Sequence, residues 1–181
     1  MAKIKHARKI ADLPKPYHTA AMAEVQNQTD RGAAIVGGAY VDLVVREALT
    51  AKMSDVPDII STLFENRGAL QDFGARIQLA LVLGVYGNRA YKDLCIIKDI
   101  RNAFAHSAEA MDFTHDDVTK LCDRLWFPQK IRYGERSMPA TAKEKYIRAV
   151  ELLTDGLHDD IRRIKAGQAT SSFLMMGPKG T

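Results

Sequence analysis

One segment of the sequence, residues 31–53, limits the possible folds more than any other. It reads RGAAIVGGAYVDLVVREALTAKM and is apolar on almost every side when it is wound as an α-helix. A helix of this kind belongs in the middle of a helical domain, because any exposed face would leave apolar surface in water. Gly32, Gly37 and Gly38 each weaken such a helix by about 1 kcal/mol relative to alanine, but together they let another helix approach closely. The segment therefore predicts a central helix with close neighbours.

The remaining sequence supplies further helices and no convincing strand. Helical spacing of apolar residues, with caps or turn residues at the ends, is found at residues 18–28, 56–64, 73–86, 91–106, 114–125 and 141–166. We therefore predict an all-α protein, a compact helical bundle with a C-terminal helical arm. Its expected parts are a basic leader over residues 1–16, the bundle over 17–125, an irregular segment plus a C-terminal helix that packs on the bundle over 126–166, and a loose tail over 167–181.

The composition fits a soluble domain that needs no metal, cofactor or disulfide. A chain of 181 residues buries roughly 70% of its unfolded surface on folding, which is enough for a stable core. Only Cys95 and Cys122 could form a disulfide, and Cys95 lies on a predicted helix, so a reduced, cytoplasmic protein is the simpler interpretation. No apolar run approaches the roughly 20 residues of a membrane span. The His and Asp residues at 114–117 and 158–160 are better explained by a helix cap and a solvated helix face than by a metal site.

The charge distribution permits weak binding to nucleic acid but does not favour sequence-specific DNA binding. The net charge is +4, and 22 acidic residues are interspersed with 26 basic ones. The basic clusters lie in the leader, at 130–136 and at 162–165, which do not share one face. The sequence has no helix-turn-helix pattern, zinc-ligand spacing or continuous basic recognition helix. If the protein regulates transcription, we expect it to act through a regulatory protein partner.

Arg101 breaks the apolar pattern of the predicted helix that contains it. It falls within the apolar arc, where a guanidinium group needs an acidic partner or a polar cleft. Asp42 of the central helix is the candidate acid, and two pairings remain open: a surface pair of Asp42 with Arg46, or a buried pair of Asp42 with Arg101. Arg31 lies on the same side of the central helix as Asp42. Arg31, Asp42, Arg46 and Arg101 therefore form a predicted buried polar network.

Three blocks of sequence resemble the mannitol operon repressor family. They are RGAAIVGGAYVD, LFENRGALQDFGARIQLALVLGVYG and YKDLCIIKDIRNAFAHS, and their order and spacing match the family over about residues 29–107. The resemblance implies an all-α bundle in a bacterial cytoplasm with a role in transcriptional regulation, namely repression of a sugar-alcohol operon. It fades after Ser107, so it does not extend to the C-terminal arm.

Arg101, Asn102 and His106 carry a second, shorter resemblance, to the HEPN superfamily. Many of its members are metal-independent ribonucleases, in which the arginine would steady the scissile phosphate and the histidine would move protons at the 2′-hydroxyl. On a continuous helix Arg101 and His106 point about 140° apart, so they can converge only if the helix ends at Phe104. The structural alternative is a paired core arginine and a histidine favoured by the helix dipole. Both interpretations stay open at this point, and so does the question of whether the protein is an enzyme.

A homo-oligomer is also expected from the sequence. The segment 31–53 needs apolar cover on every side, and the predicted helices after Ser107 have narrow apolar stripes. The resemblance to the HEPN superfamily implies the same, since active sites in that superfamily are normally composite sites across a dimer.

Overall fold

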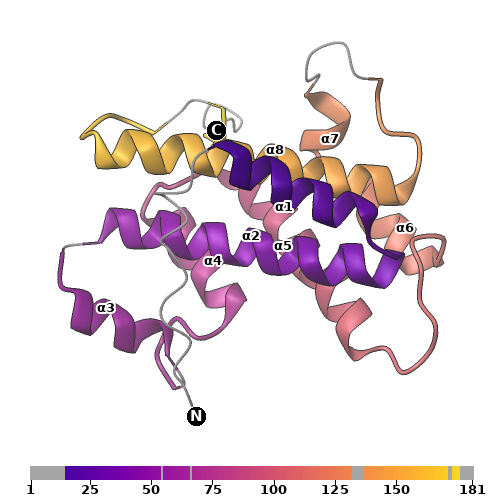
Figure 1. The fold of residues 1–181 in the computed structure, drawn as a ribbon, viewed down its shortest axis with the longest axis horizontal. Coiled ribbons are helices and arrows are strands. Elements are labelled where there is room, and N and C mark those ends of the chain that lie inside the picture. Colours follow the sequence, from indigo (N-terminus) through magenta and orange to yellow (C-terminus); the bar gives the residue numbers. More distant parts are fainter. Residues whose placement is uncertain (1–14, 54, 66, 132–136, 171–172, 176–181) are drawn as a thin grey trace.

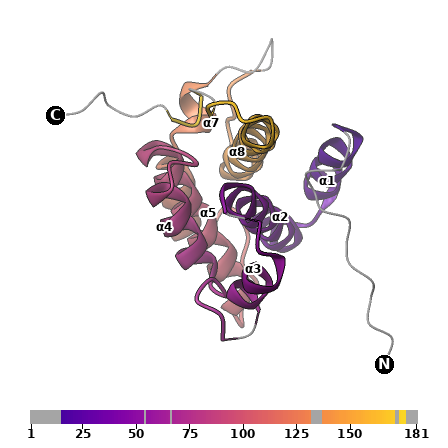
Figure 2. The same ribbon diagram turned by 90° about the vertical axis from the view of Figure 1, so that its left-hand side faces the viewer.

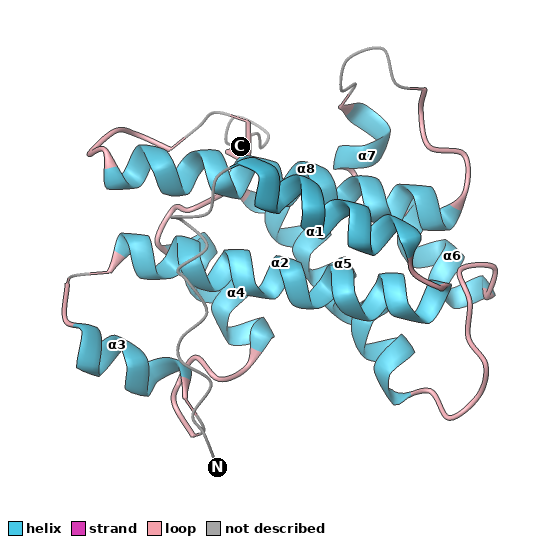
Figure 3. Ribbon diagram, in the orientation of Figure 1, coloured by secondary structure: helices cyan, strands magenta, loops and turns pink. Residues whose placement is uncertain are grey.

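The structure is a computed structural model that describes residues 15–53, 55–65, 67–131, 137–170 and 173–175. All regular secondary structure within these residues is helical, which confirms the all-α prediction (Figures 1 and 3). The helices are α1 (Lys15–Asn27), α2 (Asp30–Lys52), α3 (Pro57–Phe64), α4 (Phe73–Val82), α5 (Asn88–His106), α6 (Asp116–Asp123), α7 (Phe127–Lys130) and α8 (Ala142–Lys165). None of these helices is both long enough and apolar enough to cross a membrane.

Helix α2 is the centre of the bundle, as its sequence predicts. It contacts α1, α4, α5 and α8, and Figure 2 shows it enclosed by these four helices. Two glycines allow the closest of these contacts. A Cβ atom on Gly38 would lie 2.7 Å from Cβ of Arg101 in α5, and one on Gly37 would lie 3.1 Å from the ring of Tyr146 in α8. The glycines therefore set the spacing between α2 and its two longest neighbours.

The cover of α2 comes from within one chain. Its apolar residues Val41, Val44, Val45 and Leu49 are completely buried without a second copy. Burial of α2 therefore gives no argument for self-association, and the expected homo-oligomer stays a prediction.

Caps set the beginnings of the long helices. The side chain of Thr29 accepts a hydrogen bond from the Gly32 amide at α2, and Thr141 and Glu144 form a reciprocal capping box at α8. Helix α1 begins at Lys15, slightly earlier than expected, because Pro16 is tolerated in the first turn of a helix. Helix α4 ends at Val82 and not near residue 86, since Gly84 adopts a left-handed backbone conformation with φ of 64°.

The C-terminal helix α8 packs along α2 and completes the core. Tyr146 is fully buried, and its hydroxyl donates a hydrogen bond of 2.7 Å to the carbonyl of Ala34. Within the tail, Phe173–Met175 contact the bundle and Leu174 is completely buried. That the tail as a whole is loose stays a prediction. The basic leader residues 1–14 and the basic residues at 132–136 lie outside the described residues.

Asp93 is a buried acid that the sequence did not single out. It lies on α5 and is only 1% exposed. Its carboxylate accepts hydrogen bonds of 2.9 Å from the backbone amides of Trp126 and Phe127, which begin α7. Burial raises the pKa of Asp93 to about 6, although these two amides oppose the shift. This side chain therefore joins α5 to α7 at the cost of burying a carboxyl group.

The pH dependence of the free energy of unfolding tests whether the pKa of Asp93 is raised in the folded protein. Its pKa is 3.8 in the reference state and about 6 in the fold, so the folded protein binds more protons between these values. Ionisation of Asp93 should therefore lower the free energy of unfolding by about 3 kcal/mol as the pH rises through this window. Asp93→Asn keeps an oxygen acceptor but cannot ionise. Urea melts give the free energy of unfolding of the parent and of Asp93→Asn at each pH. From about pH 4 to about pH 7 the parent should lose stability relative to the variant.

Asp93→Ala serves as the control, because it leaves both amides without an acceptor. It should cost about 1–3 kcal/mol for each unsatisfied amide. A difference between Asp93→Asn and the parent that does not change with pH would contradict the raised pKa.

Candidate functional site

Arg101 lies at the seam between α2 and α5. Its Cβ and Cγ atoms pack against Gly38, and the side chain is half-buried. Its Nη1 donates a hydrogen bond of 2.8 Å to Oδ1 of Asn102. It makes no ion pair with any described residue. Arg101 is therefore held in place by packing and by its neighbour, and its guanidinium keeps N–H donors for an outside group.

The partner of Asp42 is Arg76 of α4, which corrects both expected pairings. Arg76 donates from Nε to Oδ1 of Asp42 at 2.7 Å and from Nη2 to Oδ2 at 2.6 Å. Its Nη1 donates to the carbonyls of Leu70 and Gln71 at 2.6 and 2.8 Å. The Arg76 and Asp42 side chains are only 10% and 17% exposed. Such a bidentate pair, with the remaining donors satisfied, is the geometry that a buried ion pair requires.

The other two residues of the predicted network have separate roles. The guanidinium of Arg46 lies 4.7 Å from the centre of the Phe64 ring, a cation–π contact between α2 and α3. Arg31 donates from Nη2 to the carbonyls of Ser107 and Glu109, at 3.2 and 2.7 Å, and so fixes the chain where α5 ends. The four predicted residues therefore do not form one hydrogen-bonded network.

Electrostatics still connect Asp42 to both Arg76 and Arg101. Burial raises the pKa of Asp42, while the Arg76 pair and the nearby charge of Arg101 act in the opposite direction. Arg76 could have been suspected from the sequence, because it too interrupts an apolar run, FGARIQLALVLGVY. Nothing in the sequence says which of the two arginines meets the acid.

His106 is the last residue of α5 and is exposed. Because the helix continues through His106, the condition under which Arg101 and His106 would converge within one chain is not met. The catalytic role of Arg101, Asn102 and His106 stays a prediction. Among the described residues there is also no group of three or more side chains that could hold a metal ion.

A cluster of two histidines and a tyrosine joins α1, α2 and α8, and sequence analysis missed it. The Tyr40 hydroxyl is 2.9 Å from Nδ1 of His18 and 2.9 Å from Nε2 of His158. Nε2 of His18 lies 3.5 Å from the carboxylate of Asp155. Burial and the nearby His18 lower the pKa of His158 to about 4, and burial raises the pKa of Tyr40 to about 12. At neutral pH His158 and Tyr40 are therefore uncharged.

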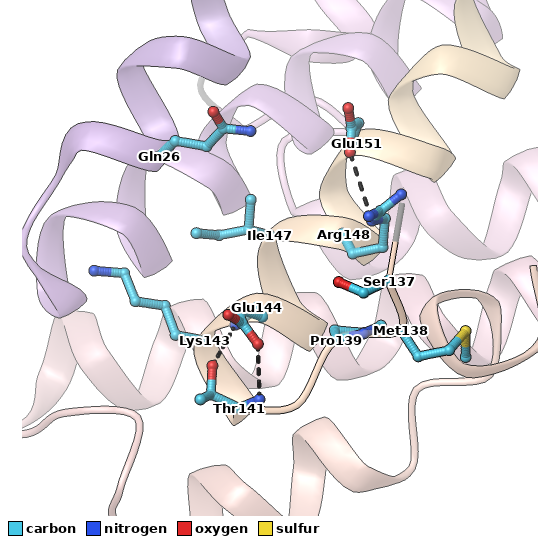
Figure 4. A pocket seen from close by; sticks show the side chains of 10 residues that line it. All are labelled: Gln26, Ser137, Met138, Pro139, Thr141, Lys143, Glu144, Ile147, Arg148 and Glu151. Atoms are coloured by element: carbon cyan, nitrogen blue, oxygen red, sulfur yellow. Dashed lines mark hydrogen bonds and ion pairs between the residues drawn. The ribbon is translucent and has the colours of Figure 1, made fainter. Parts of the chain in front are cut away.

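A groove of about 490 Å³ lies between the end of α1, the beginning of α8 and residues 137–141 (Figure 4). Ile147 and Met138 provide apolar lining. The charged lining residues already have partners: Lys143 lies 2.9 Å from Asp30, Arg148 lies 3.8 Å from Glu151, and Glu144 belongs to the capping box. The groove therefore presents no charged constellation that would indicate catalysis.

A matched pair of substitutions separates the roles of Arg76 and Arg101. Arg76→Ala should lower the free energy of unfolding by about 3–5 kcal/mol, because it strands the buried Asp42 carboxylate. Arg101→Ala should cost only about 1 kcal/mol, since Asp42 keeps Arg76 and a single hydrogen bond is lost. Urea melts of both variants measure the difference. The reverse order of costs would show that Arg101 is the true partner of Asp42.

Comparisons with known proteins agree with this fold. The sequence model of the mannitol repressor family, MtlR, matches residues 38–164, which run from α2 to α8. A solved structure described as the X-ray structure of the MtlR–HPr complex from Escherichia coli contains a chain of similar fold, with a TM-score of 0.64 and 16% identity; the match covers 80% of this chain and 99% of that chain. A search of curated proteins found no match. Since the family model spans most of the sequence, this chain belongs to the mannitol repressor family.

Proposed function

We propose that this protein is a bacterial, cytoplasmic transcriptional regulator of the mannitol repressor type that acts by binding a partner protein. The observation that carries the proposal is the shared fold with a chain solved in a complex of MtlR with HPr. HPr, or a protein that resembles it, is therefore the proposed partner. Family membership supports the regulatory role.

The shapes of the helices support a protein partner over direct DNA reading. In the C-terminal half of the described chain, the two helices joined by the shortest linker are α6 and α7, so they are the pair to compare with a helix-turn-helix. Helix α7 has only 4 residues. Phe127 and Pro128 of α7 are buried, so this short helix cannot enter a major groove as a recognition helix.

The distribution of charge supports the same conclusion. Many basic side chains on the surface are paired with acids, as in Lys98–Asp99, Lys143–Asp30, Lys145–Asp123 and Arg163–Asp159. These pairs lie on α2, α5, α6 and α8, so positive and negative charges are interspersed on this part of the surface. Such a surface supports only weak, salt-sensitive binding to a phosphate backbone.

Binding of HPr is the first test of the proposal. Calorimetric titration of the protein with HPr from the same bacterium should give saturable binding with a Kd of roughly micromolar order, typical of transient regulatory contacts. An unrelated small protein of similar charge is the control. The absence of saturable binding at tens of micromolar of both proteins would contradict the proposal.

Two surface variants would locate the contact. Ile59 of α3 and Val82 of α4 are 59% and 79% exposed, the largest values among the exposed apolar side chains of the described residues. Exposed apolar side chains are frequent contact points in interfaces. Loss of HPr binding in Ile59→Asp or in Val82→Asp, with an unchanged melting temperature, would assign the contact to one of these helices.

Direct DNA binding is the second test. In a gel shift at physiological salt, the protein alone should not select its operator DNA over unrelated DNA, because it lacks a reading helix. Any weak binding should disappear as the salt concentration rises. Sub-micromolar, sequence-dependent binding by the protein alone would show that it reads DNA without a partner.

A further inference from the structure

The chain after α8 turns back and returns along the helix that it has just left. Gly167 adopts a left-handed conformation with φ of 68°. Its amide donates to the carbonyl of Ile164, and the amide of Gln168 donates to the carbonyl of Arg163, at 3.0 and 2.8 Å. This hydrogen-bonding pattern closes the helix and reverses the chain. As a result, Leu174 reaches Gly156, about two and a half turns before the end of α8.

Leu174 and Phe173 pack against two glycines and an aromatic ring of the bundle. A Cβ atom on Gly156 would lie 2.8–2.9 Å from three carbon atoms of the Leu174 side chain, so only glycine leaves room for this leucine. The Gly87 amide, between α4 and α5, donates a hydrogen bond of 2.9 Å to the carbonyl of Leu174. Phe173, the residue before Leu174, places its ring 5.3 Å from that of Phe127. We call Gly87, Phe127 and Gly156 the Leu174 socket.

The Leu174 socket has the two parts of a site that recognises an extended peptide. A pocket takes one side chain, and a backbone amide outside any regular helix bonds to the main chain of the bound segment. The proposed function does not use this site, and Leu174 lies outside residues 38–164, which the family model matches. We propose that the Leu174 socket is a peptide-binding site that the chain's own tail occupies, and that it accepts a leucine-bearing extended segment of a partner protein when the tail is displaced.

The described tail residues 173–175 contact the bundle through both side chains and backbone. Leu174 is buried and its carbonyl accepts a hydrogen bond from the Gly87 amide, and the Phe173 ring lies against that of Phe127, while Met175 is 43% exposed. These contacts compete with the conformational entropy lost when the tail is ordered. Tethering gives the tail an effective concentration of about millimolar at the socket, so a free peptide cannot compete until the tail is weakened.

The test uses the full-length chain and a synthetic peptide with the sequence of residues 168–181. The Leu174→Ala chain has an empty socket and should bind this peptide roughly tenfold or more tightly than the parent chain does, because the tethered competitor is lost. A peptide that carries Leu174→Ala should not bind. Fluorescence polarisation measures both affinities, and circular dichroism checks that the variants are folded.

The double variant Leu174→Ala, Gly156→Ala is the matched control. The methyl group of the new alanine at position 156 would occupy the place of the leucine side chain and should abolish peptide binding. The substitution should not unfold α8, because alanine has a higher helix propensity than glycine. Failure of the folded Leu174→Ala chain to bind the peptide would overturn the proposal. Equal binding of the two peptides, or undiminished binding by the double variant, would overturn it as well.

Hydrogen exchange on the unmodified protein tests the displacement of the tail without any substitution. The Gly87 amide is protected by Leu174, whereas the Ile97 amide lies in the middle of α5. If the tail opens by itself, the Gly87 amide should exchange roughly 100-fold or more faster than the Ile97 amide. Equal exchange rates would mean that the tail leaves only on global unfolding, and the proposal would then be wrong.

Discussion

The close approach of α2 to α5 and α8 is the constraint on which the rest of the structure depends. Gly37 and Gly38 leave no side chain between these helices, so Tyr146 and the stem of Arg101 lie directly on the α2 backbone. Interiors of this density transmit small displacements to their neighbours. The positions of the Asp42–Arg76 pair, the Arg101 guanidinium and the groove at α8 all follow from this contact, because each of them is attached to α2, α5 or α8.

Arg76 of α4 and Arg101 of α5 have separate roles, although one arginine was expected to fill both. Arg76 neutralises Asp42 and ties the end of the loop before α4 to α2. Arg101 is therefore not needed to satisfy that acid, although its charge still acts on Asp42. A half-buried cation without an acidic partner is unusual among side chains that serve the fold alone.

The sequence predicts the architecture well and the pairings poorly, for physical reasons. The apolar segment around α2, its glycines and the caps at Thr29 and Thr141 act locally, so their effects can be derived from neighbouring residues. The partner of Asp42 depends on how α4 is rotated against α2, which periodicity does not determine. Leu174 gave no signal either, because a single leucine in a short tail has no periodicity and its socket comes from glycines far away in the sequence.

The single hydrogen of the Tyr40 hydroxyl gives the attachment of α1 a direction. When both neighbouring rings are neutral, one histidine nitrogen donates to the hydroxyl and the other accepts from it. The carboxylate of Asp155 lies 3.5 Å from Nε2 of His18 and favours a hydrogen on that nitrogen, so Nδ1 of His18 accepts from the hydroxyl and Nε2 of His158 donates to it. The junction of α1, α2 and α8 is therefore joined by hydrogen bonds that all point the same way, from His158 through Tyr40 to His18.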